Sequence, residues 1–309
     1  MHNYVVGWDD YGKYGYIRNR SGIQSVSKTL EYCYDDWCIA QMALKLSKQD
    51  DYNFYIKRAE NYKKLLDTVT GFIRPRQIEF EPNFDPYAIT NSYTEGNGWQ
   101  FSFYVPHDIS GQMKLLGSKE RLATMLDSLF TTTSVLHGNL RPDVTGMVGQ
   151  YAHGNEPSHQ IAYEYDYAGQ PWKTQFRVRE IMKNLYHDQP DGIAGNDDCG
   201  QMSAWYVLSA FGLYPVCPGS NEYAIGSPLI DKAAIHFESG KTFTIRTVNN
   251  RPGNVYINFA KLNGSDYTKS YLTYEDMAKG GEIEFTMSAV PNKNWGSSDS
   301  DVPVSKIEP

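Results

Sequence analysis

The chain has 309 residues, 40% of them hydrophobic, and a net charge of −7 at pH 7. This length and hydrophobic content can bury a large core, so we expect one large domain or two unequal ones. Because the chain is acidic and lacks a long basic run, there is no electrostatic reason to expect nucleic acid as a partner. Aromatic residues make up 14% of the chain, and their amphipathic rings suit both protein cores and sugar faces.

Neither a membrane span nor an export signal is predicted. No stretch approaches the roughly 18 consecutive apolar residues that a transmembrane helix needs, and the first twenty residues lack a secretory hydrophobic region. The four cysteines form no CxxC pair. Cys33 and Cys38 are five residues apart in a predicted helix and are poorly placed for a disulfide with each other. The cysteine pattern leaves the redox compartment open.

The first two thirds of the chain have the periodicity of helices, with apolar residues recurring every three to four positions. A succession of paired helices fits an α/α toroid, in which connecting loops gather at one end and carry function. We therefore expect a mainly α fold with antiparallel neighbouring helices. The predicted helices cover residues 26–46, 52–66, 119–130, 171–186 and 200–213.

After "YPVCPGSNEY" the pattern changes to short β-type runs, "AAIHF", "FTIRTV", "NVYINFAKLNG" and "EIEFTM". Ser239-Gly240 and Asn263-Gly264 are typical hairpin breaks between them. We expect a helical catalytic region over residues 1–216 and a smaller β-rich region over residues 217–309.

Polar residues gather in the loops between the predicted helices. "SYTEGNGWQFSFYVPHD" contains Glu95, followed by Trp99 and His107. "HGNEPSHQ" adds Asn155, Glu156, His159 and Gln160 around Pro157, which fits the first turn of a helix. A lone loop glutamate is usually solvated, and Asn155 with Glu156 also fits an ordinary helix N-terminus.

The third loop, "GNDDCG", places Asn196, Asp197 and Asp198 before a predicted helix. One aspartate can cap that helix, but only one residue can occupy the N-cap, so the second carboxylate needs another reason.

A single polar site would explain all three loops. Amide and carboxylate oxygens suit a hard cation such as Ca²⁺, whereas the scattered Cys and His lack the spacing of a zinc site. Separated carboxylates also suit glycosidic cleavage, in which one protonates the departing oxygen and the other activates water. Spacing alone leaves both interpretations open.

Four blocks resemble glycoside hydrolase family 92, the calcium-dependent exo-acting α-mannosidases: "TLEYCYDDWCIAQMA", "TEGNGWQFSFYVPHD", "HGNEPSHQIAYEYDYAGQPWKTQ" and "GNDDCGQMSAWYVLSAFGLYPVCPGS". The resemblance runs from about Tyr14 to Trp295. It implies an (α/α)6 toroid preceded by an N-terminal β-sandwich, and inversion of anomeric configuration at mannose. The implied substrate is a mannose-containing oligosaccharide, with α-1,2-linked mannose of N-glycans or mannans expected. A secreted or bacterial periplasmic location is also implied.

The resemblance also assigns roles to residues. It implies Glu95 as general acid, Asp198 as general base and Asp197 as its support. Asn155 and Glu156 are the implied calcium ligands, joined by an oxygen of Asn196 or Asp198. The implied sugar contacts are Trp99, His107, His159 and Gln160. Calcium would hold mannose O2 and O3 and help flatten the ring.

The sequence also departs from the family. Gln160 stands where relatives often have His, which leaves the linkage preference open. The chain starts where a relative would be well inside its toroid, so we expect the helical region to be incomplete at its N-terminus and activity to need the missing N-terminal domain. Two alternatives stay open, a noncatalytic sugar-binding or structural remnant and a toroid glycosidase acting on another sugar.

Overall fold

The computed structural model describes residues 7–20, 24–305 and 307, and these form two compact units. The first unit contains the described residues up to Ser158 together with Ser305 and Ile307, and the second contains residues 159–304. Helix predominates before Leu213 and strand after it, which agrees with the change of period in the sequence. The chain is therefore a mixed α and β structure.

The first unit is mostly helical, with four very short strands. Its helices are α1 (Trp8–Tyr14), α2 (Ser25–Lys45), α3 (Gln49–Ala59), η1 (Glu60–Lys64), α4 (Gly98–Phe101), α5 (Ile109–Leu116), α6 (Lys119–Thr131) and η2 (Glu156–Ser158). Its strands are β1 (Ala88–Ile89), β2 (His137–Gly138), β3 (Met147–Val148) and β4 (Tyr151–Ala152).

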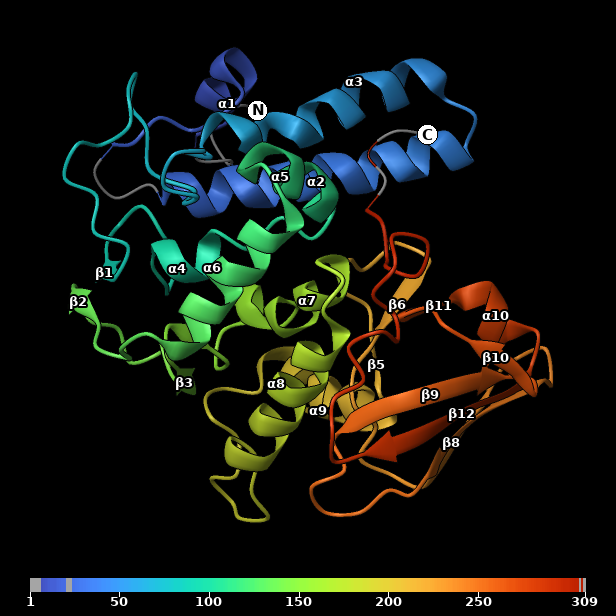
Figure 1. Cartoon of the computed structure of the whole chain (residues 1–309). Helices are drawn as coiled ribbons and strands as arrows, with labels where there is room; N and C mark the ends of the chain where they lie inside the picture. Colours follow the sequence, from blue (N-terminus) through green and yellow to red (C-terminus); the bar gives the residue numbers. More distant parts are fainter. Residues whose placement is uncertain (1–6, 21–23, 306, 308–309) are drawn as a thin grey trace. The chain divides into compact units, whose positions relative to one another are not determined.

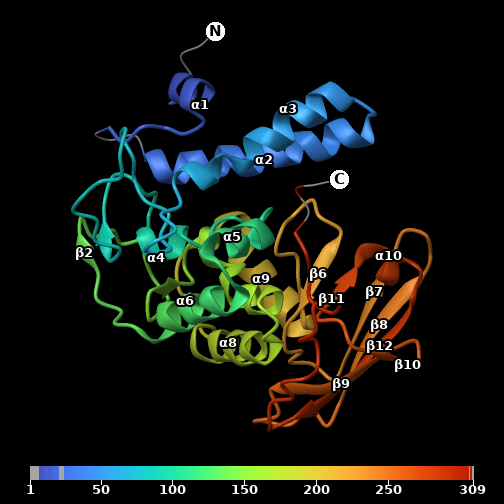
Figure 2. The same cartoon turned by 45° about the horizontal axis from the view of Figure 1, so that its top comes forward.

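Helices α2 and α3 form an antiparallel pair and lie side by side in both views (Figures 1 and 2). The buried stripe of α2 has the spacing of one helix face, and it consists of Val26, Leu30, Cys33, Trp37 and Ala40. The predicted helix over residues 26–46 is confirmed. The helix predicted over residues 52–66 ends earlier, because the chain tightens into the 3₁₀ turn η1 after Ala59.

The second unit combines helices with most of the strands. Its helices are η3 (Ile161–Tyr163), α7 (Glu164–Tyr167), α8 (Pro171–Asn184), η4 (Asp198–Gly200), α9 (Gln201–Phe211) and α10 (Tyr274–Ala278). Its strands are β5 (Leu213–Tyr214), β6 (Glu222–Ile225), β7 (Lys232–His236), β8 (Thr242–Val248), β9 (Tyr256–Leu262), β10 (Ser265–Tyr267), β11 (Tyr271–Thr273) and β12 (Gly281–Ser288).

The largest sheet of the second unit has the strand order β10-β9-β12-β8-β7, with β12 parallel to β8 and antiparallel to β9. Along β12, Ile283, Phe285 and Met287 are buried and alternate with partly exposed residues, as a sheet with one covered face requires. They pack with Phe243 and Ile245 of β8 in one apolar core. This core stabilises the sheet independently of the polar loops.

Both predicted hairpin breaks are confirmed. The β7–β8 pair turns at Ser239-Gly240, and the β9–β10 pair turns at Asn263-Gly264. Asn263 and Gly264 both have positive φ, the conformation that favours Asn and Gly in tight turns. The predicted domain boundary between residues 216 and 217 falls inside the second unit, near the change from helix to strand, and stays a prediction.

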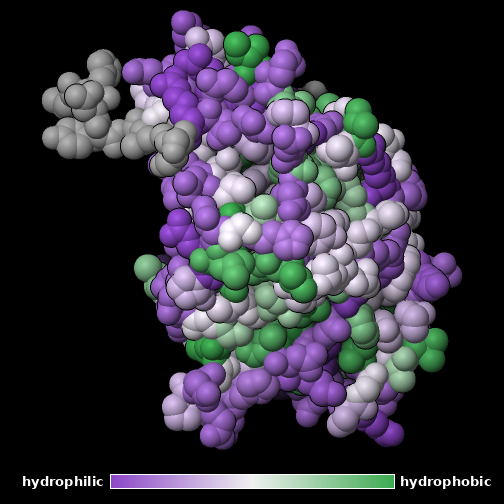
Figure 3. All heavy atoms as spheres, turned by 90° about the vertical axis from the view of Figure 1, so that its left-hand side faces the viewer, coloured by the Kyte–Doolittle hydropathy of each residue, from purple (hydrophilic) through white to green (hydrophobic). Residues whose placement is uncertain are grey.

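On the face shown in Figure 3, hydrophobic residues occur in groups among hydrophilic ones. Within the described ranges, no helix combines the length and the apolar character that crossing a membrane requires. All four cysteines are free, which agrees with the prediction for Cys33 and Cys38.

Candidate active site

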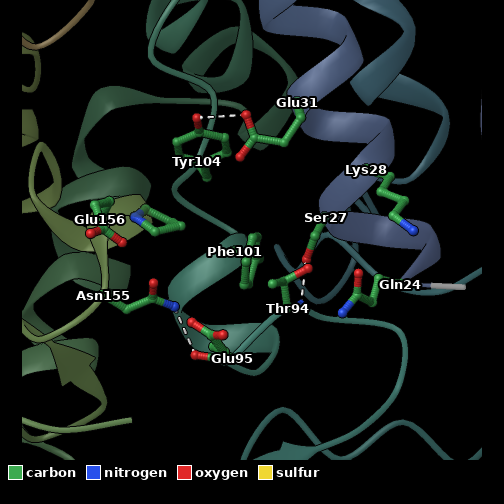
Figure 4. Close-up of a pocket in the computed structure, with 11 residues that line it drawn as sticks. Gln24, Ser27, Lys28, Glu31, Thr94, Glu95, Phe101, Tyr104, Asn155 and Glu156 are labelled. Atoms are coloured by element: carbon green, nitrogen blue, oxygen red, sulfur yellow. Dashed lines mark hydrogen bonds between the residues drawn. The ribbon is translucent and has the colours of Figure 1, made fainter. Parts of the chain in front are cut away.

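The first unit contains a pocket of about 340 Å³ (Figure 4). It lies between α2, η2 and the segment of residues 94–104, which includes α4. Three carboxyl groups and one ammonium group line it, namely Glu31, Glu95, Glu156 and Lys28. Three of the residues predicted from the loop motifs, Glu95, Asn155 and Glu156, therefore meet at one cavity. Its other lining residues are Gln24, Ser27, Thr94, Phe101, Tyr104 and Pro157.

Glu95 sits in an unusual backbone conformation, with φ of 49°. A residue other than glycine in this left-handed region is strained and needs neighbours that hold it. Asn155 Nδ2 donates a hydrogen bond to the Glu95 carbonyl oxygen at 2.8 Å (Figure 4). One residue earlier, the Thr94 N–H donates to Ser27 Oγ at 2.7 Å. The turn that carries Glu95 is thus anchored to both η2 and α2.

The chain after Glu95 is fixed by the capping box of α4. The Asn97 side chain accepts a hydrogen bond from the Trp99 N–H at 3.0 Å, and Gln100 Oε1 accepts one from the Asn97 N–H at 2.7 Å. Asn97 Nδ2 also donates to Gln150 Oε1 at 2.9 Å. Asn97, Gln100 and Gln150 are all buried, so the loop that carries Glu95 rests on a buried polar network.

Glu31 and Tyr104 were not predicted from the sequence, although both line the pocket. The Tyr104 hydroxyl donates to Glu31 Oε2 at 3.1 Å (Figure 4). Burial raises the pKa of the Glu31 carboxyl above its ordinary value, and the hydrogen bond from Tyr104 opposes that shift. A signal was present, because the pocket-lining residues of α2 follow helical spacing, Ser27, Lys28 and Glu31, and Gln24 precedes them at the N-cap.

Trp99 and His107 lie in the interior, and neither lines the pocket. The Trp99 ring packs edge-on against Phe72, with ring centroids 4.8 Å apart. His107 is 2% exposed, contacts the Tyr62 ring and forms a hydrogen bond from Nε2 to the Ala59 carbonyl at 3.0 Å. Burial lowers the pKa of His107 to about 4. Contacts with core residues hold both rings, and the predicted sugar contacts of Trp99 and His107 stay predictions.

Asp197 and Asp198 lie in the exposed loop that leads into α9 of the second unit. Asp197 accepts hydrogen bonds from the Ser203 N–H and hydroxyl, and these bonds lower the pKa of the Asp197 carboxyl. Ser203 is the third residue of α9, so Asp197 satisfies a free amide of the first turn. Gly200 occupies the N-cap of α9, so Asp197 bonds the first turn from outside the N-cap position. Asp198 and Asn196 are both exposed.

His159 and Gln160 belong to the second unit and are buried. His159 Nδ1 lies 3.2 Å from Gln201 Nε2, and the His159 carbonyl accepts a hydrogen bond from Trp205 Nε1 at 2.9 Å. Helix α9 therefore orients this histidine.

The predicted calcium ligands belong to both units. Asn155 and Glu156 are adjacent in the first, and Asn196 and Asp198 lie in the second. Their side-chain oxygens are the donors that Ca²⁺ prefers. Across the described residues, no three His, Cys, Asp or Glu side chains are grouped closely enough to hold a metal ion. The donor chemistry fits calcium, which takes six to eight oxygens, and the side chains of Asn155 and Glu156 would offer two of them.

The glycosyl hydrolase family 92 catalytic domain matches residues 2–289. The chain belongs to glycoside hydrolase family 92. A family 92 α-mannosidase from Bacteroides thetaiotaomicron, solved in complex with mannoimidazole, is 41% identical with a TM-score of 0.92, and the alignment covers 98% of this chain and 41% of that one.

Two further comparisons are with glycosidases. An inverting mannosidase from Bacteroides thetaiotaomicron is 40% identical with a TM-score of 0.87, covering 97% of this chain and 42% of that one. An uncharacterized secreted glycosidase from Arthroderma benhamiae is 31% identical, covering 97% of this chain and 40% of the relative. The chain thus spans about 40% of the length of the relatives it matches.

Proposed function

We propose that the protein is an inverting, exo-acting α-mannosidase. The observation that carries this proposal is that Glu95, in a chain of family 92, lines a pocket beside Asn155 and Glu156. A related α-mannosidase solved in complex with mannoimidazole supports mannose as the sugar, and a related inverting mannosidase supports inversion. The proposed substrate is α-1,2-linked mannose at the ends of N-glycans or mannans.

In the proposed mechanism two carboxyl groups have separate roles. Glu95 protonates the departing glycosidic oxygen as its bond to the anomeric carbon breaks, and Asp198 accepts a proton from the water that forms the new bond. Because water attacks the face opposite the leaving group, the first product is β-mannose. Asp197 supports this arrangement by holding the start of α9 through Ser203.

We also propose Ca²⁺ as cofactor, with Asn155, Glu156, Asn196 and Asp198 as the residues that would hold it. When bound, the ion would supply positive charge to mannose hydroxyls and favour a flattened ring. The proposed location is outside the cytoplasm, which the description of the Arthroderma benhamiae relative as secreted supports. The (α/α)6 toroid and the need for an N-terminal domain stay predictions.

The role of Glu95 is tested in the intact protein with Glu95→Gln and two kinds of mannoside. Disaccharides have poor leaving groups that need protonation, whereas activated aryl mannosides do not. We expect turnover of the disaccharide to fall by about 10²- to 10⁴-fold, as removal of a general acid predicts, and aryl mannoside turnover to fall far less. Equal losses on both substrates would show that Glu95 is not the acid.

A further inference from the structure

We propose that Asn155 is a positioning residue for Glu95, and that its amide nitrogen fixes the turn on which the acid is carried. This inference rests on the proposed function, because it assumes that Glu95 is the general acid. The observation behind it is the 2.8 Å hydrogen bond from Asn155 Nδ2 to the Glu95 carbonyl oxygen (Figure 4).

The backbone of Glu95 gives this bond its importance. With φ of 49°, Glu95 occupies a strained conformation that persists only when neighbouring groups hold it. Gly96 follows directly and can adopt many conformations. Relaxation of φ rotates the chain about the N–Cα bond of Glu95 and would move both its carbonyl and its side chain. The hydrogen bond from Asn155 to that carbonyl opposes this rotation.

The anchors on either side do not replace Asn155. Ser27 holds the amide of Thr94 at 2.7 Å, and the capping box holds the amide of Asn97. Both bonds fix N–H groups next to Glu95 in the chain, whereas the bond from Asn155 fixes the Glu95 carbonyl itself. Asn155 is 8% exposed, so water competes weakly for its amide. The three anchors together set the direction of the Glu95 side chain.

This role uses the nitrogen of the amide, and calcium binding would use the oxygen. The Asn155 oxygen points away from the Glu95 carbonyl (Figure 4), so one side chain can serve both purposes. The two roles separate in Asn155→Asp, which keeps an oxygen for a cation but loses the donor and sets a carboxylate against the Glu95 carbonyl. Asn155→Ala removes both the oxygen and the donor.

The experiment compares Asn155→Asp, Asn155→Ala and Glu95→Gln in the intact protein, with disaccharide and activated aryl mannoside substrates. If Asn155 positions the acid, Asn155→Asp lowers disaccharide turnover by about 10²-fold, the loss that a shift of about 1 Å in a reacting group brings. Aryl mannoside turnover falls far less, as in Glu95→Gln, and the basic limb of the pH profile shifts. Calorimetric titration with Ca²⁺ shows whether Asn155→Asp still binds the metal.

Asn53→Asp is the matched control, because Asn53 is exposed on α3 and the change adds the same charge; it should leave both rates unchanged. If Asn155→Asp does not fold, Ser27→Ala removes the neighbouring anchor and should give a smaller loss with the same substrate pattern. The inference is overturned if Asn155→Asp keeps wild-type disaccharide turnover, or if it loses both substrates equally. Equal losses in Glu95→Gln would instead overturn the proposed acid and this inference with it.

Discussion

Asp197 accepts two hydrogen bonds from Ser203, one from the backbone N–H at 3.0 Å and one from the hydroxyl at 2.7 Å. Its neighbour Asp198 is exposed in the same loop. The geometry separates two adjacent carboxylates into a structural group and a group that is available to water. Three positive φ values shape this loop and its junction with α9, at Gly195, Cys199 and Gly200.

Asp197 and Asp198 should respond differently to substitution. Asp197→Ala should lower the melting temperature, because the first turn of α9 loses its acceptor. Asp198→Asn should leave melting unchanged and lower turnover of both disaccharide and aryl mannosides by about 10²- to 10⁴-fold, since both need an activated water. Thermal melts and steady-state rates on the same preparations measure this. Ser203→Ala is the control: it removes the hydroxyl bond and keeps the backbone bond, so it should lower the melting temperature less than Asp197→Ala does. An unchanged melt in Asp197→Ala would contradict the structural role of Asp197.

Glu31 should make the protein less stable as the pH rises. Burial raises its pKa above the ordinary value of 4.5, so the folded protein holds this proton to higher pH than the unfolded chain does. The protonated Glu31 side chain is therefore tolerated in the fold below pH 4.5, and the free energy of unfolding decreases as the pH rises through the pKa of Glu31 in the folded protein. Glu31→Gln keeps an acceptor for Tyr104 and removes the charge. Its melting temperature should exceed that of the wild type at pH 7 and match it at pH 4; no difference at pH 7 would argue against this account.

His107 should make the protein less stable as the pH falls. Burial lowers its pKa from 6.5 to about 4. Between pH 6.5 and pH 4 the His107 ring is therefore protonated in the unfolded chain and neutral in the folded protein. Stability is full above pH 6.5 and declines as the pH falls toward 4. His107→Gln can still donate to the Ala59 carbonyl and does not titrate. Thermal melts recorded from pH 7 to 4 should show that the melting temperature of His107→Gln changes less with pH than that of the wild type. Parallel curves would show that His107 does not cause the loss of stability at low pH.

Turnover should require Ca²⁺, because Asn155 and Glu156 offer adjacent oxygen ligands at the pocket. We expect activity of the intact protein to disappear after exhaustive treatment with EDTA and to return on addition of Ca²⁺. Mg²⁺ should restore it poorly, since that ion demands a smaller, near-octahedral shell. Full activity after metal removal would rule out the cofactor.

Part of the fold was predictable from local pattern. The spacing of Val26, Leu30, Cys33, Trp37 and Ala40 predicts α2, since periodicity reports which face is buried. The end of α3 was not predictable, because Tyr62 and Leu65 stay buried in and after η1 and continue the apolar pattern. Periodicity does not distinguish an α-helix from a 3₁₀ turn that buries the same side chains.

The pocket-lining residues that belong to loop motifs were predictable from the sequence, and those that belong to a helix were less predictable. Glu95, Asn155 and Glu156 line the pocket, as their motifs suggested. Glu31 was missed, because a polar residue on a helix resembles any solvated one until a neighbouring element faces it. His107 shows the reverse: a polar residue in a loop motif that tertiary packing places in the core.

Proton NMR of the first sugar released tests the central claim most directly. The intact protein is mixed with an α-linked mannose disaccharide, and the anomeric signals are followed before mutarotation mixes them. Direct attack by a water that Asp198 activates predicts β-mannose as the first product, with α-mannose appearing only later. α-Mannose as the first product would contradict inversion and the roles assigned to Glu95 and Asp198.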